Sequence, residues 1–251
     1  MTPTIASPQN PRLKALRRLQ GGRARTRAGA FAAEGEDLVA AAERAGIAPL
    51  EGFRVAGSGL GNDDFHDVER SALAVVSTLG SGTRVIGVYE QRWAPAPAGP
   101  LCVYLHGVGD PGNVGAVLRA AEAFGASGVA LGPGCADPHS PKAVRASMGA
   151  IFTVALARVE DPALLPGRRI ALLAGAEEPL RGPAGDGVLA PVTLLVGAER
   201  EGLPRELVAA CEGAARIPIA SHSLNAAMAA TVALYEMTRG AGLCELRMRG
   251  S

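Results

Sequence analysis

Three glycines that precede an expected helix have the spacing of a nucleotide-binding loop. Gly107, Gly109 and Gly112 follow the pattern GxGxxG, in which backbone amides at a helix start can bind a dinucleotide pyrophosphate. However, Pro111 removes one amide from this loop. The nearest acid that could hold a ribose, Asp137, follows a Gly-Pro-Gly turn rather than ending the next strand. A nucleotide-dependent oxidoreductase is therefore the last-ranked interpretation.

Polar residues before the last long apolar segment could act in chemistry or in helix capping. His222 stands beside Ser223, but adjacent side chains usually point apart and no GxSxG motif surrounds this serine, which disfavours a hydrolase. Ser223 and Asn225 could both cap the helix that follows.

The first thirty residues carry positive charge and no acid, although the whole chain has a formal net charge of only +1. Such a run either forms a surface that follows nucleic-acid phosphates or is simply a solvated helix. The cations of this run are Arg12, Lys14, Arg17, Arg18, Arg23, Arg25 and Arg27.

Composition limits the class of protein. With 251 residues, 48% hydrophobic and 20% charged, the chain is expected to be globular with one or two domains, which excludes disordered and collagen-like proteins. No apolar stretch approaches the roughly 18 residues of a membrane span, so a cytoplasmic protein is expected. The cysteines are widely spaced and indicate neither a metal site nor a disulfide framework. They are Cys102, Cys135, Cys211 and Cys244.

A proline-rich linker at 91–100 predicts a domain boundary, with domains at 1–96 and 97–251. The first domain is expected to be a small mixed α/β unit, with a helix at 36–45 and strands at 53–57, 73–77 and 84–90. In the second, apolar runs that alternate with helices predict a parallel sheet covered on both faces. Its expected strands are 101–107, 128–132, 151–156, 169–175, 192–197 and 215–219, and its expected helices are 114–124, 142–148, 204–211 and 224–239.

Four segments in order carry a family resemblance: "HGVGDPGNVGAVLRAAEAFGASGVAL", "KAVRASMGAIFTVAL", "LLVGAEREGLP" and "IPIASHSLNAAMAATVALYE". They resemble the successive motifs of the SpoU/TrmH family of RNA 2′-O-ribose methyltransferases. The segments "SPQNPRLKALRRL" and "AGAFAAEGEDLVAAA" are similar to the amino-terminal substrate-binding domain of members that act on ribosomal RNA.

The resemblance implies a SPOUT-like parallel α/β domain with a trefoil knot, preceded by a ribosomal-protein-like domain, in a homodimer without a metal. It implies methyl transfer from S-adenosyl-L-methionine to a ribose 2′-hydroxyl of ribosomal RNA. Alternatives are the same activity on transfer RNA and a non-catalytic RNA-binding or ribosome-assembly protein. The segment 220–222 is two residues shorter than is common in the family, at a loop that lines the cofactor pocket in relatives.

The matching positions give expected roles. Arg119 is expected to clamp an RNA phosphate and orient the hydroxyl, because a guanidinium with a pKa above about 12 is a poor base. The expected catalytic residues are Asn113, Arg119, Glu199, Ser223 and Asn225; the expected cofactor residues are Gly197, Ile217 and Leu224; and the expected RNA-binding residues are Asn10, Arg12, Lys14, Arg27 and Arg145. A chain that begins near Pro97 is expected to fold alone and bind the cofactor.

Overall fold

The computed structural model describes residues 3–79, 82–183, 190–220 and 223–239, and its contacts group the chain into two units. Unit 1 comprises Met1–Gln91 together with Asp137–Phe152, and unit 2 comprises Arg92–Ala136 together with Thr153–Ser251. The chain therefore passes between the units three times. The domain boundary after residue 96 stays a prediction.

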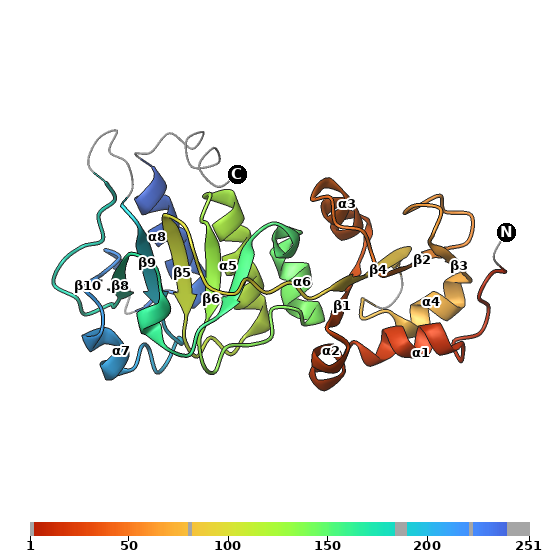
Figure 1. The fold of residues 1–251 in the computed structure, drawn as a ribbon, viewed down its shortest axis with the longest axis horizontal. Coiled ribbons are helices and arrows are strands. Elements are labelled where there is room, and N and C mark those ends of the chain that lie inside the picture. The colour runs from red at the N-terminus through yellow and green to blue at the C-terminus, as the bar shows by residue number, and fades with distance from the viewer. Residues whose placement is uncertain (1–2, 80–81, 184–189, 221–222, 240–251) are drawn as a thin grey trace. The chain divides into compact units, whose positions relative to one another are not determined.

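Unit 1 is built on a four-stranded mixed sheet in the order β1-β4-β2-β3 (Figure 1). Strand β4 is antiparallel to both β1 and β2, whereas β3 is parallel to β2. The strands are β1 (Ala30–Glu34), β2 (Glu51–Val55), β3 (His66–Val68) and β4 (Val85–Glu90), and the helices are α1 (Pro11–Arg18), α2 (Gly22–Ala28), α3 (Glu36–Arg44), α4 (Arg70–Val76) and α6 (Pro141–Ser147), followed by the 3₁₀ turn η1 (Ala150–Phe152).

The first helix shows how the basic run folds. Asn10 caps α1 and Pro11 occupies its first turn, both of which favour a helix start. Leu13, Leu16 and Leu19 are spaced by three residues and are all buried, so they form one apolar stripe. This stripe belongs to the core of unit 1, where α1 packs against α4.

The strand expected at 73–77 is wrong, because this stretch lies mostly in helix α4. Ala72, Leu73 and Val76 are buried while Val75 is exposed, and this is the spacing of a helical face. A short apolar run with β-branched residues fits a buried strand equally well in sequence.

Residues 137–152 pack against the first ninety residues, although the chain continues from them into unit 2 at both ends. Helix α6 packs against β1. The Phe31 ring lies 4.9 Å from the His139 ring and 5.9 Å from the Phe152 ring, and Tyr89 meets Phe152 edge-on at 4.8 Å. These rings form an aromatic cluster that fixes the segment in unit 1.

Unit 2 confirms the predicted α/β fold with a parallel sheet. Its strand order is β10-β8-β9-β5-β6-β7, and every adjacent pair is parallel (Figure 1). Central strands β5 and β9 are buried along their whole length, as their continuous apolar sequences predict. The strands are β5 (Leu101–Leu105), β6 (Gly128–Leu131), β7 (Ala155–Arg158), β8 (Arg168–Leu172), β9 (Val192–Val196) and β10 (Gly213–Ala215), and the helices are α5 (Pro111–Ala123), α7 (Arg205–Ala209) and α8 (Ala226–Thr238), with the 3₁₀ turn η2 (Pro162–Leu164).

Two expected strands of unit 2 differ from the structure by more than three residues at one end. Residues 151–152 belong to η1, and the strand begins only at Ala155. The strand expected at 215–219 is β10, which ends at Ala215. None of the helices in the described part of the chain combines the length and the apolar character needed to cross a bilayer.

Candidate functional site

A cavity that is open to solvent lies where β8 and β9 end in unit 2. Parallel sheets commonly bind ligands beyond the carboxyl ends of their strands, which is where this cavity lies. The cavity is lined by Leu172, Leu173, Ala174, Val196, Gly197, Ala198, Glu199, Gly202, Ile217, Ile219, Ser223, Leu224, Ala226 and Ala229.

The three residues expected to bind the cofactor, Gly197, Ile217 and Leu224, all lie in this lining. The structure also brings Glu199 and Ser223 to it. The contribution of 172–174 was missed in the sequence analysis, although the position of this segment at the end of a predicted strand could have indicated it.

Gly197 lies where no side chain fits. A Cβ at this position would lie 2.3 Å from the carbonyl carbon of Gly202, much closer than atoms approach without displacement. The turn between them is held by the amide of Gly202, which donates to the carbonyl of Ala198 at 2.9 Å, and Gly202 adopts a φ of +68°. Glycine at 197 therefore allows the 198–202 turn to pack against the end of β9, at the wall of the cavity.

Three of the expected catalytic residues form one hydrogen-bonded network. The Asn113 Nδ2 donates to Glu199 Oε1 at 2.8 Å, and the Asn225 Nδ2 donates to the same oxygen at 2.6 Å. The Asn225 Nδ2 also lies 3.0 Å from Asn113 Oδ1. Residues separated by up to 112 positions in sequence thus converge on one carboxylate oxygen.

Two helix starts position this network. Asp110 caps α5 through its Oδ1, which accepts from the amides of Gly112 at 2.5 Å and Asn113 at 3.2 Å. Asn225 caps α8 through its own Oδ1, which accepts from Ala227 N at 2.9 Å. Because α5 packs against α8, the two caps hold the Asn113 and Asn225 amides beside Glu199.

The α5 cap also bears on the nucleotide-loop interpretation. The Gly112 and Asn113 amides, which a pyrophosphate would need, are bonded to the Asp110 carboxylate. A phosphate there would have to displace this carboxylate and would meet its negative charge. The loop geometry therefore argues against dinucleotide binding.

The remaining catalytic candidates are placed differently. Arg119 is exposed on α5, six residues beyond Asn113, and forms no hydrogen bond or ion pair with any residue that the structure describes. Ser223 borders the cavity but does not cap α8, since Asn225 does. Ser221 and His222, and with them most of the shortened loop, lie outside the described residues.

The five RNA-binding candidates all belong to unit 1. The Asn10 side chain accepts from the Arg12 amide at 2.9 Å and so serves as a helix cap, and the Arg12 guanidinium forms an ion pair with Glu51. Exposed positions on three different helices are occupied by Lys14, Arg27 and Arg145.

Metal and disulfide chemistry find no support in the described part of the chain. No cluster of three or more His, Cys, Asp or Glu side chains there could hold a metal ion. Cys102, Cys135 and Cys211 are free thiols, and burial raises the pKa of Cys102 to about 11. Cys244 lies outside the described residues.

Comparison with known proteins gives one consistent family. Residues 100–235 match the SpoU rRNA Methylase family. The chain is similar to an AdoMet-bound rRNA methyltransferase from Sinorhizobium meliloti, with a TM-score of 0.82 and 32% identity over 94% of this chain and 97% of that one. It also resembles the SpoU methyltransferase AviRb from Streptomyces viridochromogenes, with a TM-score of 0.78 and 27% identity over 92% and 97% of the two chains.

Among curated proteins, the chain is 37% identical to a 23S rRNA (uridine(2479)-2′-O)-methyltransferase from Streptomyces viridochromogenes. That match extends over 51% of this chain and spans about half the length of the relative, 49%.

Proposed function

Because this chain belongs to the SpoU rRNA methylase family, we propose that it transfers a methyl group from S-adenosyl-L-methionine to a ribose 2′-hydroxyl of RNA. The proposed substrate is ribosomal RNA, because the similar proteins from Sinorhizobium meliloti and Streptomyces viridochromogenes are rRNA methyltransferases.

The observation that carries the proposal is the network of Asn113, Glu199 and Asn225 at the edge of the cavity. It joins residues from three of the segments that resemble the family motifs, and Glu199 belongs to both the network and the cavity lining. A polar group fixed in this way beside an apolar pocket is what substrate positioning requires.

The cavity fits the proposed methyl donor. Its lining is largely aliphatic, which suits the flat face of an adenine, and glycine at 197 lets the 198–202 turn pack against the end of β9 at the cavity wall. Gly197, Ile217 and Leu224 would hold the donor in this cavity. When bound, S-adenosyl-L-methionine supplies an electrophilic methyl group on a sulfonium, whose thioether leaves neutral.

The chain's own groups must position the ribose and help its hydroxyl lose a proton. A guanidinium is a poor base, but the exposed guanidinium of Arg119 can bind an RNA phosphate through two parallel hydrogen bonds and so orient the hydroxyl. Glu199 holds the Asn113 and Asn225 amides, which fixes the starts of α5 and α8 around the reacting groups.

The proposal includes further features that the family resemblance implies: a trefoil knot, a homodimer, a cytoplasmic location and a ribosomal-protein-like character of the first domain. The knot is supported by the way in which segments that are separate in sequence, 172–174, 196–202, 217–219 and 223–229, meet at one cavity. Sedimentation of the purified protein at several concentrations tests the dimer.

The direct test incubates the purified chain with S-adenosyl-L-methionine and either ribosomal or transfer RNA, and maps alkali-resistant linkages at 2′-O-methylated riboses. We expect methylation of ribosomal RNA. Methylation of transfer RNA alone would move the substrate assignment, and RNA binding without methylation at saturating donor would favour the non-catalytic alternative.

The Arg119→Ala variant tests the role of the guanidinium. Loss of one transition-state contact lowers the rate by on the order of 10²-fold or more. We expect that loss in single-turnover methyl transfer, with donor affinity measured by calorimetry unchanged. Near-normal turnover would contradict the assigned role.

A further inference from the structure

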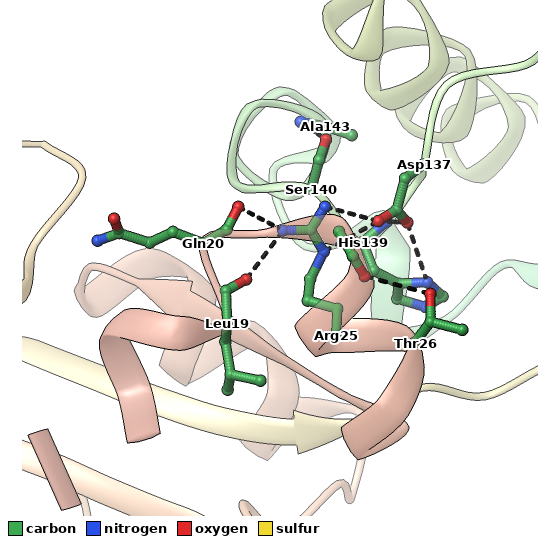
Figure 2. Close-up of polar contacts among 9 residues, drawn as sticks. Leu19, Gln20, Arg25, Thr26, Asp137, His139, Ser140 and Ala143 are labelled. Atoms are coloured by element: carbon green, nitrogen blue, oxygen red, sulfur yellow. Dashed lines mark hydrogen bonds and ion pairs between the residues drawn. The ribbon is translucent and has the colours of Figure 1, made fainter. Parts of the chain in front are cut away.

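One arginine of the basic run is not on the surface. Arg25 is only 4% exposed, and its Nε and Nη2 donate to Asp137 Oδ2 at 2.9 and 2.7 Å (Figure 2). Its Nη1 donates to the carbonyls of Leu19 and Gln20, both at 2.8 Å. Arg25 thus joins the end of α1 to a residue 112 positions later, so the expectation that it belongs to the basic surface is wrong.

Asp137 also forms hydrogen bonds with the residues that precede α6. Its Oδ1 accepts from the amide of His139 at 2.9 Å, and its carbonyl accepts from the amide of Ser140 at 3.1 Å. Ser140 in turn caps α6, since its hydroxyl accepts from Ala143 N. The Arg25 guanidinium and the first turn of α6 are therefore connected through one short run of hydrogen bonds (Figure 2).

Helix α6 lies beside the end of α1. A small cavity is lined by Leu16, Leu19 and Gln20 on one side and by Pro141, Val144 and Arg145 on the other. Exposed cations Lys142 and Arg145 of α6 are thus carried on a helix adjacent to the basic run.

The charges of the two segments have the same sign. No acid occurs at 3–33 or at 138–159, and Asp137 between them is bonded to Arg25. Glu34 lines the cavity, but its carboxylate accepts from Ser77 Oγ at 2.9 Å and from Thr78 N at 2.7 Å. The carboxylates of Asp137 and Glu34 lie among these cations, but all formally charged residues at 3–33 and 138–159 are basic, so the two segments attract phosphate anions.

We infer that the two segments form one composite basic surface that binds the phosphate backbone of the substrate RNA, and that Arg25 and Asp137 are its positioning residues. This inference rests on the proposed function. The surface consists of Lys14, Arg17, Arg18, Arg23, Arg27, Lys142 and Arg145. Arg25 holds α6 in place and contributes no charge to the RNA.

The test compares Asp137→Asn with the unchanged chain by RNA affinity at several salt concentrations. The substitution removes one negative charge, so a purely electrostatic effect would strengthen RNA binding. Positioning predicts the opposite sign: affinity falls, and the slope of log affinity against log salt becomes shallower by about 1 to 2, as for loss of one or two phosphate contacts.

A double-mutant comparison tests whether Asp137→Asn lowers RNA affinity through Lys142 and Arg145. In the Lys142→Ala/Arg145→Ala background, Asp137→Asn should cause no further loss of RNA affinity, because the cations that it displaces are already absent. If Asp137→Asn lowers RNA affinity by the same factor in this background as in the unchanged chain, Arg25 and Asp137 do not act through α6 and the inference is overturned.

The matched control is Asp67→Asn, which removes the acid of another Arg–Asp pair of unit 1, Arg54–Asp67 at 2.8 Å. It also removes one negative charge, but the pair that it breaks lies between β2 and β3, so RNA affinity should be unchanged or slightly raised. Arg25→Lys serves if Asp137→Asn does not fold: it keeps the charge but cannot make the same four hydrogen bonds, and it should weaken RNA binding in the same way.

Donor binding and turnover separate this inference from the proposed function. Asp137→Asn should raise the KM for RNA while leaving kcat within about twofold and donor affinity unchanged. Absence of methyl transfer by the unchanged chain would contradict the proposed function, but it would leave the RNA-affinity comparison intact. A variant that only melts at a lower temperature and binds RNA normally would make Arg25 and Asp137 merely structural.

Discussion

Asn225 uses the two ends of one side-chain amide for two different tasks. Its oxygen caps α8, and its nitrogen donates to Glu199. Stability and activity can therefore be separated at this residue, because serine can replace the cap but has no group that reaches the carboxylate as the amide nitrogen does.

We expect Asn225→Ala to lower the free energy of unfolding by about 1 kcal/mol and Asn225→Ser to restore most of that loss. Both variants should lose methyl transfer to a similar extent, since neither donates to Glu199. Thermal unfolding and single-turnover rates measure the two effects. A serine variant that recovers activity along with stability would show that the cap alone matters.

Gly197→Ala tests whether the close packing of the 198–202 turn against Gly197 is required for binding of the methyl donor. The added Cβ would lie 2.3 Å from Gly202, so the 198–202 turn must move. We expect calorimetry to show a loss of S-adenosyl-L-methionine affinity of at least about tenfold, corresponding to about 1.4 kcal/mol. The control is Gly175→Ala, whose Cβ would meet nothing within 4 Å. Equal affinities in the two variants would remove Gly197 from the cofactor site.

At the scale of elements, long periodic segments were predictable and paired contacts were not. The apolar strands β5 and β9 and the long helices α5 and α8 agree in type with their sequence patterns. Helix α4 was misread because burial at 72, 73 and 76 depends on the partner helix, which local sequence does not reveal. The site residues came from resemblance to a family, since nothing local to Asn113 indicates that Glu199 or Asn225 lies beside it.

The same limit explains Arg25. In sequence it is one of several arginines, and its partner lies 112 residues away, so only the fold distinguishes it from its exposed neighbours. Arg119 differs from Arg25 in this respect. Its exposure is expected of an arginine on the polar face of a helix, but its role depends on contact with a substrate.

The edge of the six-stranded sheet carries a pH-sensitive contact between β8 and the turn before β10. Glu212 accepts from the Arg169 amide at 2.7 Å and pairs with its guanidinium, and these hydrogen bonds lower the pKa of Glu212 from 4.5 to about 2. A depressed carboxyl pKa stabilises the fold above pH 4.5, and that stabilisation is lost as the pH falls toward 2.

The difference in unfolding free energy between the unchanged chain and Glu212→Gln should therefore be constant above about pH 5 and vanish near about pH 2. Urea unfolding across this range measures it. Glu160→Gln changes an exposed carboxylate without a hydrogen bond to any described residue and should show no comparable convergence. A difference that grows on acidification would contradict the sign.

On the scale of the whole molecule, the two units are not consecutive in sequence. Removing residues 1–96 deletes Phe31 and Tyr89, against which His139 and Phe152 pack, and leaves Asp137 without Arg25. The expectation that a chain beginning near Pro97 folds alone therefore meets a physical objection: its 137–152 segment would expose buried aromatic surface.

We expect this shortened chain to aggregate or to show rapid hydrogen exchange at 137–152. The matched control is the full chain cut by a protease within the linker 92–100. Its two pieces should stay together in gel filtration, because 137–152 still packs against the first ninety residues. A shortened chain that is monodisperse and protected at 137–152 would contradict the prediction.

Because unit 1 is made of two separate stretches of sequence, its parts are synthesised at different times. Arg25 is made 112 residues before Asp137, which at about 5–20 residues per second is a delay of roughly 6 to 22 s. For that time the nascent chain carries β1 without helix α6, which later packs on it. It also carries Arg25, which is buried in the folded protein, without its partner Asp137. The amino-terminal unit can thus be completed only once residue 152 has left the ribosomal exit tunnel, so the time taken to translate 92–152 sets how long its first ninety residues wait for their last segment.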